Sequence, residues 1–376
     1  MIRFSKPFIP ESAYKYTQEV LQSGLLSGDF KFTKLCHTWL QEQIGGKKAL
    51  LTTSCTHALE MAAILCGVQP GDEVIMPSFT FSSTANAFVL RGATPVFIDV
   101  RADTMNMDEK LIEAAITSRT KGIAVVHYAG VGCEMDTITA VALKHGLWIV
   151  EDAAQGILAS YKSKPLGSFG VFGALSFHET KNFTSGEGGA LILNTTEFIE
   201  RAEVLREKGT NRTKYFRGDV DKYSWTDVGS SYLPSDINAA ILYSQLEIAE
   251  EMQARRFRAW DFYWEALKQL EAAGWISLPQ IPKECSHNAH IFYLKTSDLR
   301  ERSLLIDHLK SHGISSAFHY VPLHGTLAGK KYGRFAGNDV YTTRESERLL
   351  RLPLYAGIEV PELQLVVDSV LGFYKS

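Results

Sequence analysis

A lysine that follows a strand is the first residue of this sequence whose setting favours chemistry. In LSFHETKNFTSGEGGALIL, residues 175–193, a strand is expected to end at Ser176–His178, and Lys181 then precedes a glycine-rich turn. An amine held against such backbone loses hydration, which lowers its pKa and frees it to form a Schiff base with a carbonyl. Taken alone, a lysine in this position is more often a surface residue.

A carboxylate at the end of another apolar strand favours a chemical role for Lys181 over that of a surface residue. The run LWIVEDAAQG, residues 147–156, delivers Asp152 at the carboxyl end of its strand, where open α/β sheets bind their ligands. A carboxylate there can pair with a protonated pyridine nitrogen and make the ring an electron sink. Asp152 could equally cap a helix, but its spacing before the lysine segment favours the first interpretation.

A turn rich in hydroxyl groups follows a third strand. In LLTTSCTHALEMAA, residues 50–63, Ser54, Cys55 and Thr56 lead directly into an amphipathic helix. Free amides and hydroxyls at a helix start suit a phosphate group, although an ordinary helix cap is the commoner role. Cys55 is either a catalytic thiolate or, as is commoner for cysteine, a small buried side chain. No Walker-type loop occurs, which disfavours nucleotide hydrolysis.

The strands that deliver these residues belong to a longer alternation. Short apolar runs, many of them β-branched, alternate with helical patterns, and the helices expected at 56–67 and 136–146 end in glycine. This alternation predicts an α/β fold whose mostly parallel central sheet carries helices on both faces. The runs lie at residues 47–53, 73–79, 94–100, 122–128, 147–154, 173–179 and 189–194.

The pattern of expected helices and strands changes near Glu247. We expect an N-terminal arm and a large α/β domain over residues 1–246, and a smaller α+β domain over residues 247–376. The second part opens with a long charged helix at 255–274 and continues with HNAHIFYLK, SLLIDHLKSHG and SSAFHYVPLH. No linker rich in proline, glycine or serine separates the two parts, so they should pack tightly.

Composition excludes several classes of protein. The 39 basic and 42 acidic residues give a net charge of -3, which argues against binding to nucleic acid or to an anionic membrane. The chain shows no spanning apolar stretch, and MIRFSKPFIP lacks the apolar core of a signal peptide. The five cysteines are far apart, as expected of reduced thiols. We therefore expect a soluble cytoplasmic protein.

Four motifs occur in an order and spacing that resemble a known family. TTSCTHAL, PGDEVIMPSFTF, EDAAQG and SFHETKNFTSGEGG, with essentially the whole of the chain, resemble the DegT/DnrJ/EryC1/StrS aminotransferases, which modify nucleotide-linked sugars. The resemblance implies the fold-type I architecture of transferases that use pyridoxal 5'-phosphate (PLP). It also implies a site without a metal ion, and a homodimer with its active sites at the interface.

The resemblance assigns roles to single residues around the cofactor. Lys181 becomes the Schiff-base lysine and general acid/base, and Asp152 the partner of the pyridine nitrogen. Gln155 would bond the phenolic oxygen of the cofactor. Phe81 would stack on the ring, whereas Phe79 is expected in the core. Further cofactor contacts are expected from Ser54, Cys55, Thr56, Ala154 and Ser176.

Substrate contacts are expected from AFHYVPLHG and from a basic loop. The first segment offers Tyr320 and His324, with His319 beside them, although a lone histidine is often structural. A solvated charged loop is likewise the alternative for the second segment. The basic side chains that could meet a diphosphate there are Arg212, Lys214 and Arg217.

Arg351 and Leu233 could affect how charged groups of the substrate and cofactor are bound. Arg351 is the one nearby candidate for a carboxylate clamp, and its alternative role is a surface charge at a helix end. Leu233 stands where many relatives have an arginine or asparagine that reaches the phosphate of the partner's cofactor. That contact is in doubt here, and Ser230, Ser231 or Tyr232 could substitute.

Three further segments narrow the expected reaction. Residues 209–233, 317–324 and 342–355 most resemble the family members that aminate TDP-4-keto-6-deoxyglucose in enterobacterial common antigen synthesis. This implies transfer from L-glutamate to TDP-4-keto-6-deoxy-D-glucose, giving TDP-4-amino-4,6-dideoxy-D-galactose. One alternative is amination at C3 of a TDP-3-keto-6-deoxyhexose, because ring position depends on pocket shape. Another is a non-catalytic PLP-binding sensor or scaffold. A dehydratase of the superfamily would replace Lys181 by histidine.

Overall fold

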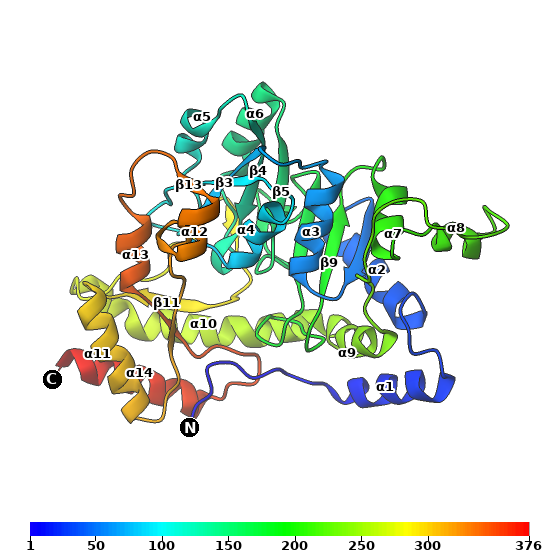
Figure 1. Cartoon of the computed structure of the whole chain (residues 1–376). Coiled ribbons are helices and arrows are strands. Elements are labelled where there is room, and N and C mark those ends of the chain that lie inside the picture. The colour runs from blue at the N-terminus through cyan, green and yellow to red at the C-terminus, as the bar shows by residue number, and fades with distance from the viewer. Residues whose placement is uncertain (376) are drawn as a thin grey trace.

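An eight-stranded sheet forms the centre of the molecule (Figure 1). The computed structural model describes residues 1–375. The strand order is β1-β9-β8-β5-β4-β2-β3-β13, and β9 runs antiparallel to both of its neighbours while the other pairs are parallel. The α/β fold with a mostly parallel sheet is therefore confirmed. The strands are β1 Lys48–Thr52, β2 Glu73–Pro77, β3 Thr94–Ile98, β4 Thr120–Val126, β5 Trp148–Asp152, β8 Phe172–Ser176, β9 Gly189–Leu193 and β13 Arg334–Phe335.

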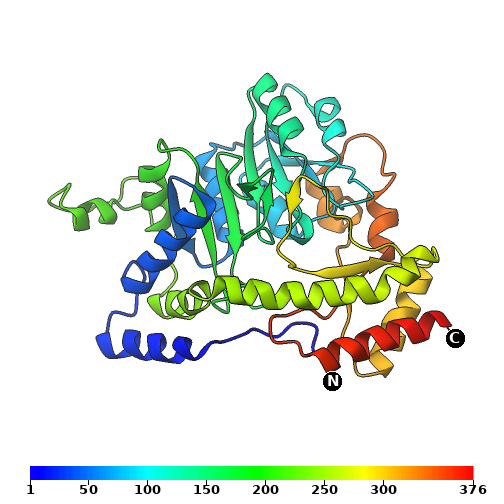
Figure 2. The same ribbon diagram turned by 180° about the vertical axis from the view of Figure 1, so that it is seen from behind.

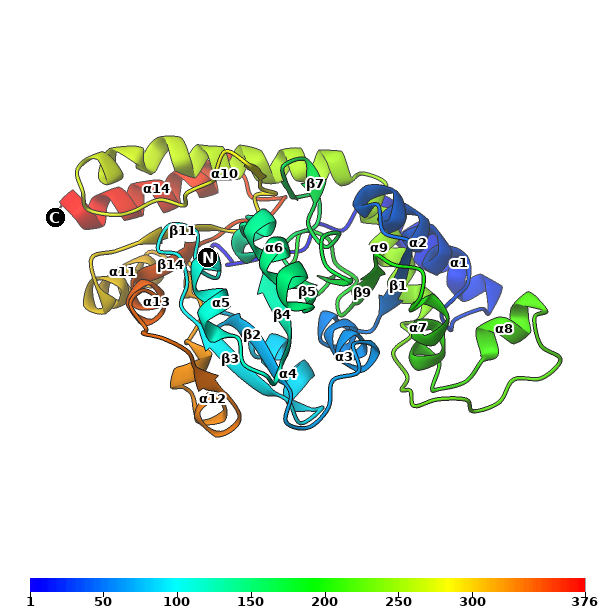
Figure 3. The same ribbon diagram turned by 90° about the horizontal axis from the view of Figure 1, so that it is seen from above.

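Both faces of this sheet are covered by helices, which explains the continuous apolar runs. Leu50 packs into the core on one face while its neighbours Ala49 and Leu51 pack on the other, as the alternation of a strand requires. The first face carries α3 Cys55–Leu65, α4 Ser82–Val89 and α7 Ile199–Arg206. The second carries α2 Lys31–Ile44, α5 Ile112–Ala115, α6 Met135–His145 and α9 Asp236–Leu246 (Figure 3).

A second layer of structure is built on the long helix α10, Ala249–Ala272, which runs beneath the central sheet (Figure 2). Alongside the C-terminal half of α10 lies a smaller antiparallel sheet in the order β11-β14-β12. Its own apolar core joins β11 and β14 to α10, α11 and α14. The elements of this part are β11 Phe292–Lys295, α11 Leu299–Ser311, β12 Ala317–Phe318, α12 Leu327–Tyr332, α13 Thr342–Arg348, β14 Leu349–Leu352 and α14 Val360–Lys375.

The remaining elements are peripheral. α1, Glu11–Ser23, lies along α9, and α8, Arg212–Arg217, stands away from the body of the molecule (Figures 1 and 3). A three-stranded ribbon has the order β10-β6-β7, with β6 Ser160–Tyr161, β7 Lys164–Pro165 and β10 Cys285–Ser286. In the described part of the chain, no helix is long and apolar enough to cross a bilayer.

The two parts of the chain exchange short segments. β13, from the C-terminal part, pairs with β3 in the central sheet, and Ile2 of the N-terminal arm bridges to Ile314 in the smaller part. Neither the strands nor the apolar clusters divide cleanly between residues 246 and 247, since Ile2 packs in the core of the smaller part and Ala249 and Met252 in that of the larger one. The division into domains remains an interpretation.

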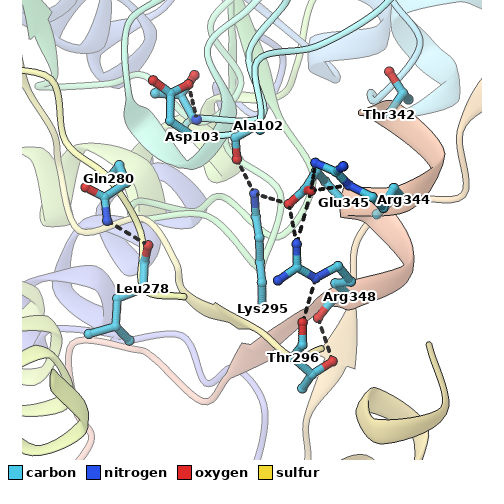
Figure 4. A network of polar contacts seen from close by, with 12 residues as sticks. Ala102, Asp103, Leu278, Gln280, Lys295, Thr296, Thr342, Arg344, Glu345 and Arg348 are labelled. Carbon is cyan, nitrogen blue, oxygen red and sulfur yellow. Dashed lines mark hydrogen bonds and ion pairs between the residues drawn. The ribbon is translucent and has the colours of Figure 1, made fainter. Parts of the chain in front are cut away.

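A buried ionic network fastens the smaller part to the larger one (Figure 4). The ammonium group of Lys295, at the end of β11, donates to the carbonyl of Ala102 in the larger part and to Glu345 Oε2, 3.0 Å away. Lys295 and Glu345 are 3% and 2% exposed. Glu345 also accepts from Arg344 and Arg348. Because the buried Lys295–Glu345 pair compensates its own charges and the more exposed Arg344 and Arg348 share the same carboxylate, the network can hold α13 against the sheet.

Asp99 makes a second connection between the parts. This carboxylate follows β3 and is 2% exposed. It accepts backbone N–H groups of Val340, Tyr341 and Thr342 at 2.9, 2.9 and 2.7 Å, and the Thr342 hydroxyl as well. Burial opposes ionisation, but the hydrogen bonds from Thr342 and from these amides outweigh it and hold the pKa of Asp99 below its ordinary value.

We predict that Asp99→Asn lowers the free energy of unfolding by about 2–4 kcal/mol, because an amide cannot accept all four donors and leaves some of them buried without a partner. Urea unfolding at pH 7 measures the loss, and Asp307→Asn, at an exposed site on α11, should change stability by less than about 0.5 kcal/mol.

The pH dependence provides a check on this assignment. The pKa of Asp99 is depressed in the folded state, so its contribution is complete above the unfolded pKa of about 4 and is lost as pH falls toward the folded pKa. The gap between wild type and Asp99→Asn should therefore be constant from pH 7 to 5 and narrow below pH 4. A gap that widens in acid would contradict the carboxylate's role.

Candidate active site

A cavity of about 440 Å³ lies between the carboxyl ends of the parallel strands and the smaller sheet. This volume is within the range of small-molecule sites, and its position is where open α/β sheets bind ligands. The strand ends and following turns supply Asp152, Ser176 and Lys181. The smaller part supplies the opposite wall, formed by His290, His319, Tyr320 and Arg351.

Lys181 lies in the turn between β8 and β9 and lines the cavity. Its backbone N–H donates to the carbonyl of His178 at 2.9 Å, which fixes the start of the turn. Burial lowers the pKa of the Lys181 amine, the Arg351 guanidinium acts in the same direction, and the Asp152 carboxylate opposes them. An amine with a lowered pKa is the state that attacks a carbonyl and accepts a proton.

Asp152 ends β5 and is 6% exposed. Its Oδ2 accepts the hydroxyl of Thr84 at 2.6 Å, and its Oδ1 accepts the N–H of Ala154 at 3.2 Å. The Thr84 hydroxyl in turn lies 2.7 Å from that of Thr80. These bonds orient a buried carboxylate toward the cavity, where it can pair with a cationic ring nitrogen.

The turn before α3 forms one end of the cavity. Ser54 caps the helix by accepting the N–H of His57 at 3.1 Å, so the expected capping role is present. The first amides of α3, at Cys55 and Thr56, have no acceptor within the helix and suit an anion. Gly189 makes this possible, because a Cβ there would lie 2.4 Å from the nitrogen of Cys55. Ser176, 8% exposed, lines the same cavity.

The thiol of Cys55 is not in the ionised state that a nucleophile needs. Burial raises the pKa of Cys55 well above its ordinary value, and the Asp152 carboxylate adds to the effect. A neutral thiol at the rim of the anion site is consistent with a packing contact.

Gln155 connects the cofactor side of the cavity to the opposite wall. Its Oε1 accepts the N–H of Ala129 at 2.7 Å, and its Nε2 donates to the Tyr320 hydroxyl at 3.1 Å. One N–H of Gln155 therefore stays available to a ligand. Phe79 is 1% exposed and packs edge-on to Tyr128 at 5.0 Å, whereas Phe81 is 58% exposed and lines the cavity.

Several residues expected to contact substrate lie outside the cavity in this chain. His324 uses both ring nitrogens within the protein, with Ser78 Oγ at 2.7 Å and Asp339 Oδ2 at 3.1 Å. The basic loop is engaged in ion pairs. Arg217 contacts Glu203 at 3.1 Å, and Arg212 lies 3.6 Å from Glu207. Lys214 pairs with Glu200 at 2.6 Å.

Leu233 and its neighbours also lie away from the cavity. Leu233 packs against Gly28, whose added Cβ would be 2.6 Å from Leu233 Cγ. Tyr232 is buried on the apolar face of α3, which removes it as a contact to a second subunit. Ser230 and Ser231 are exposed.

Arg351 is not a surface charge at a helix end. It lies on β14, is 9% exposed and lines the cavity, so that alternative interpretation is wrong. The helix α13 ends at Arg348, and Arg351 belongs to β14, the middle strand of the smaller sheet. There it pairs with Tyr293 on β11 and with Ala317 on β12, which keeps it away from the surface.

Two functional residues were missed by sequence reasoning, because their roles depend on distant contacts. Thr84 orients Asp152 from 68 positions away in the chain. His290 lines the cavity, and its Nδ1 lies 2.8 Å from Asn182 Oδ1. Asn182 Nδ2 donates to the carbonyl of Asn288, so its oxygen must accept from His290. Nε2 of His290 is then an acceptor, and burial holds its pKa well below 6.5.

The fold and the cavity together define an aminotransferase of the PLP-dependent class. The chain belongs to the DegT/DnrJ/EryC1/StrS aminotransferase family, whose model matches residues 7–371. This finding confirms the predicted family, fold-type I architecture and cofactor, and it makes the protein a sugar aminotransferase.

Similar proteins extend over the whole chain. The spore coat polysaccharide biosynthesis protein SpsC of Bacillus subtilis is 33% identical over 380 residues, which cover 99% of this chain and 97% of SpsC. The aminotransferase TlmJ from Streptoalloteichus hindustanus has a TM-score of 0.91 and 28% identity, covering 100% of this chain and 99% of TlmJ. PseC of Helicobacter pylori, an aminotransferase in pseudoaminic acid biosynthesis, has a TM-score of 0.90 and 25% identity, with coverage of 100% and 99%.

The residues of the cavity fit PLP. Lys181 and Asp152 stand in one cavity with the anion-binding start of α3, and the room left by Gly189 gives a phosphate access to those amides. When bound, PLP supplies an aldehyde for the lysine amine and a pyridine ring that withdraws electrons from the carbon that loses a proton.

We predict that Lys181→Ala lowers the rate of amino transfer by several orders of magnitude, because it removes both the covalent anchor and the proton carrier. Thermal unfolding should change little, since Lys181 belongs to none of the described apolar clusters. The measurement is single-turnover kinetics with L-glutamate, with Lys34→Ala on the exposed face of α2 as control. A variant that turns over at the wild-type rate would remove Lys181 from this role.

A second prediction concerns Asp152. Asp152→Asn should retain the cofactor but lose at least about 100-fold in the glutamate half-reaction, because an amide cannot keep the pyridine nitrogen protonated. Thr84→Val, which removes the 2.6 Å bond to Asp152, should cause a smaller loss, and Thr84→Ser should restore the rate. Equal rates in wild type and Asp152→Asn would be incompatible with the assignment.

Proposed function

We propose that this enzyme transfers the amino group of L-glutamate to TDP-4-keto-6-deoxy-D-glucose and releases TDP-4-amino-4,6-dideoxy-D-galactose. The product would serve lipopolysaccharide or enterobacterial common antigen synthesis in the cytoplasm. The proposal rests on the resemblance of residues 209–233, 317–324 and 342–355 to the family members with that activity, and on the character of the cavity wall.

Apart from the Arg351 guanidinium, the side chains of that wall are neutral, and this observation carries the proposal. Burial raises the pKa of Tyr320 to about 12, so its hydroxyl stays neutral at physiological pH. Burial and the Arg351 guanidinium hold the pKa of His319 well below 6.5. A hexose presents neutral hydroxyl groups, which pair with neutral donors and acceptors without the cost of burying a further charge.

The residues of the chain divide the work of two half-reactions. Lys181 would hold PLP covalently, and it is the base that would remove the proton from the α-carbon of the amino acid and return one to the reacting carbon of the sugar. Asp152 keeps the pyridine nitrogen protonated. Ser176 and the turn at Ser54–Thr56 would hold the phosphate, while Gln155 would bond the phenolic oxygen.

The ring position of amination is tested directly by product analysis. The enzyme is incubated with L-glutamate and either TDP-4-keto-6-deoxyglucose or a TDP-3-keto-6-deoxyhexose, and the products are identified by NMR. We expect a 4-amino sugar with the galacto configuration from the first substrate and little product from the second. Efficient turnover of the 3-keto sugar alone would favour the C3 alternative, and turnover of neither would favour a sensor or scaffold.

We also propose a homodimer that is completed through the arm formed by residues 209–229. This arm carries α8 and stands away from the body of the molecule (Figure 3). Its aromatic side chains are exposed, with Phe216 at 69% and Trp225 at 79%. Exposed apolar groups gathered on a projecting segment are typical of an interaction surface, and a second copy is the occupant that the family resemblance implies.

Dimer formation is expected to depend on these aromatic groups. We predict that Phe216→Ser together with Trp225→Ser raises the dimer dissociation constant at least about 100-fold, because both changes remove buried apolar area from the interface. Sedimentation velocity across a dilution series measures the change. Leu143→Ser, an exposed leucine on α6, is the matched control. A fully active wild-type monomer would refute the proposal.

The cations of the arm are proposed to bind the substrate's diphosphate across that interface. We predict that Arg212→Ala with Arg217→Ala raises the KM for the sugar nucleotide at least tenfold, about 1.4 kcal/mol, and alters the glutamate half-reaction much less. Arg258→Ala, on the exposed face of α10, serves as control. The effect should be larger at low salt, because screening weakens exposed charge contacts. Equal damage to both half-reactions would instead indicate a role in folding.

A further inference from the structure

Arg351 is a buried cation in the cavity that has no carboxylate partner. Its side chain extends from the middle strand of the smaller sheet and is 9% exposed. No aspartate or glutamate of residues 1–375 forms an ion pair with it, and its Nε is buried without a hydrogen-bond partner. An arginine remains protonated in proteins, so the cavity contains an uncompensated positive charge.

The neighbours of Arg351 position the guanidinium but leave its charge unpaired. Nη1 donates to Nε2 of His319, and Nδ1 of His319 lies 3.3 Å from the Tyr128 hydroxyl. Since arginine has no acceptor, His319 Nε2 must be the unprotonated nitrogen, which leaves its proton on Nδ1 and the ring neutral. The ring of Phe4 lies 4.5 Å from the guanidinium carbon and covers one face of the group.

The guanidinium groups of the other buried arginines, Arg206 and Arg256, have oxygen acceptors within the protein, although Nε of Arg206 is also buried without a partner. Arg206 contacts both oxygens of Asp29 at 2.6 Å, and Arg256 donates to the carbonyls of Ala289 and His290. Both therefore have structural partners, whereas Arg351 faces the cavity. Burying a charge without a partner is costly, so the cost is offset when an anion enters.

We propose that Arg351 binds the α-carboxylate of the amino acid that donates the amino group. A keto sugar carries no carboxylate on its reacting carbon, whereas an amino acid carries one a single bond away from the carbon that reacts. Arg351 and Lys181 line the same cavity, so a donor whose nitrogen reacts at the lysine's position brings that carboxylate toward the guanidinium. A guanidinium binds a carboxylate through two parallel hydrogen bonds.

This inference rests on the proposed amino acid donor, and it can be tested apart from the acceptor. The first half-reaction is followed by absorbance with L-glutamate, with 4-aminobutyrate, which lacks the α-carboxylate, and with L-norvaline, which lacks only the distal one. We expect Arg351→Gln to lower the second-order rate constant at least about 30-fold for glutamate and norvaline, and less than threefold for 4-aminobutyrate. Arg351→Lys should recover part of the loss.

Arg302→Gln is the matched control. Arg302 resembles Arg351 because its guanidinium lies 5.1 Å from the ring of Phe318 and its Nε is buried without a partner, but Arg302 does not line the cavity. It should leave all three rate constants within about twofold. Retained cofactor binding and an unchanged unfolding temperature in Arg351→Gln would show that the variant is folded.

The outcomes separate this inference from the proposed function. Equal losses with all three amines would show that Arg351 supports the fold, and a loss confined to glutamate and 4-aminobutyrate would assign it to the distal carboxylate. A loss seen only as a higher KM for the sugar nucleotide would assign it to the diphosphate. Calorimetry with glutarate needs no turnover, and it should give weaker binding to Arg351→Gln than to wild type even if the acceptor is a different sugar. Equal glutarate affinity would overturn the inference.

Discussion

Dehydration of the Lys181 amine requires groups on every side of the cavity, and the turn that carries the lysine supplies only part of them. β5 and β8 place a carboxylate and a hydroxyl at the sheet edge, but the opposite wall comes from residues more than a hundred positions later in the chain. The lowered pKa of the Lys181 amine is therefore a property of the whole molecule, in which the two parts enclose the cavity. Separating the two parts would rehydrate Lys181 and return its pKa toward the ordinary value.

Because the burial of Lys181 depends on both parts of the chain, the contacts that hold the parts together matter for its pKa. Many of these contacts are buried hydrogen bonds and ion pairs outside the cavity. Asp99 accepts four hydrogen bonds from residues 340–342, and Lys295 bridges Ala102 to Glu345 (Figure 4). Both connections lead into α13, and β14 with Arg351 follows it directly. Directional hydrogen bonds fix orientation in a way that apolar contacts do not. The position of the far wall is thus set by polar contacts made outside the cavity.

The sequence was most informative where function depends on neighbours in the chain. The strands, the lysine before a glycine-rich turn, Asp152 at a strand end and the hydroxyl-rich turn before α3 are all local patterns, and the structure brings them together because the carboxyl ends of parallel strands share one edge. The pairing of β13 with β3 was not predictable, because two residues carry no periodicity. His324 was singled out by its motif, yet its ring nitrogens face Ser78 and Asp339.

Arg351 shows most clearly why local patterns were insufficient. In RLLRLPLY an arginine follows a helix that is rich in charge, and the same letters fit a solvated helix end. In the structure the helix ends at Arg348, and the next four residues form β14, the middle strand of the smaller sheet. Alternate side chains of β14, including that of Arg351, must therefore point inward. That depends on β11 and β12, which lie far away in the sequence.

Under the proposed function, one cavity must accept in turn an amino acid with a carboxylate and a sugar that has none on its reacting carbon. A carboxylate placed beside Arg351 would lower the cost of burying the cation but would compete with the donor. A neutral histidine positions the guanidinium without neutralising it, and the Arg351 charge in turn helps to keep His319 neutral. The wall therefore combines one cation with the neutral hydrogen-bonding groups of His319 and Tyr320.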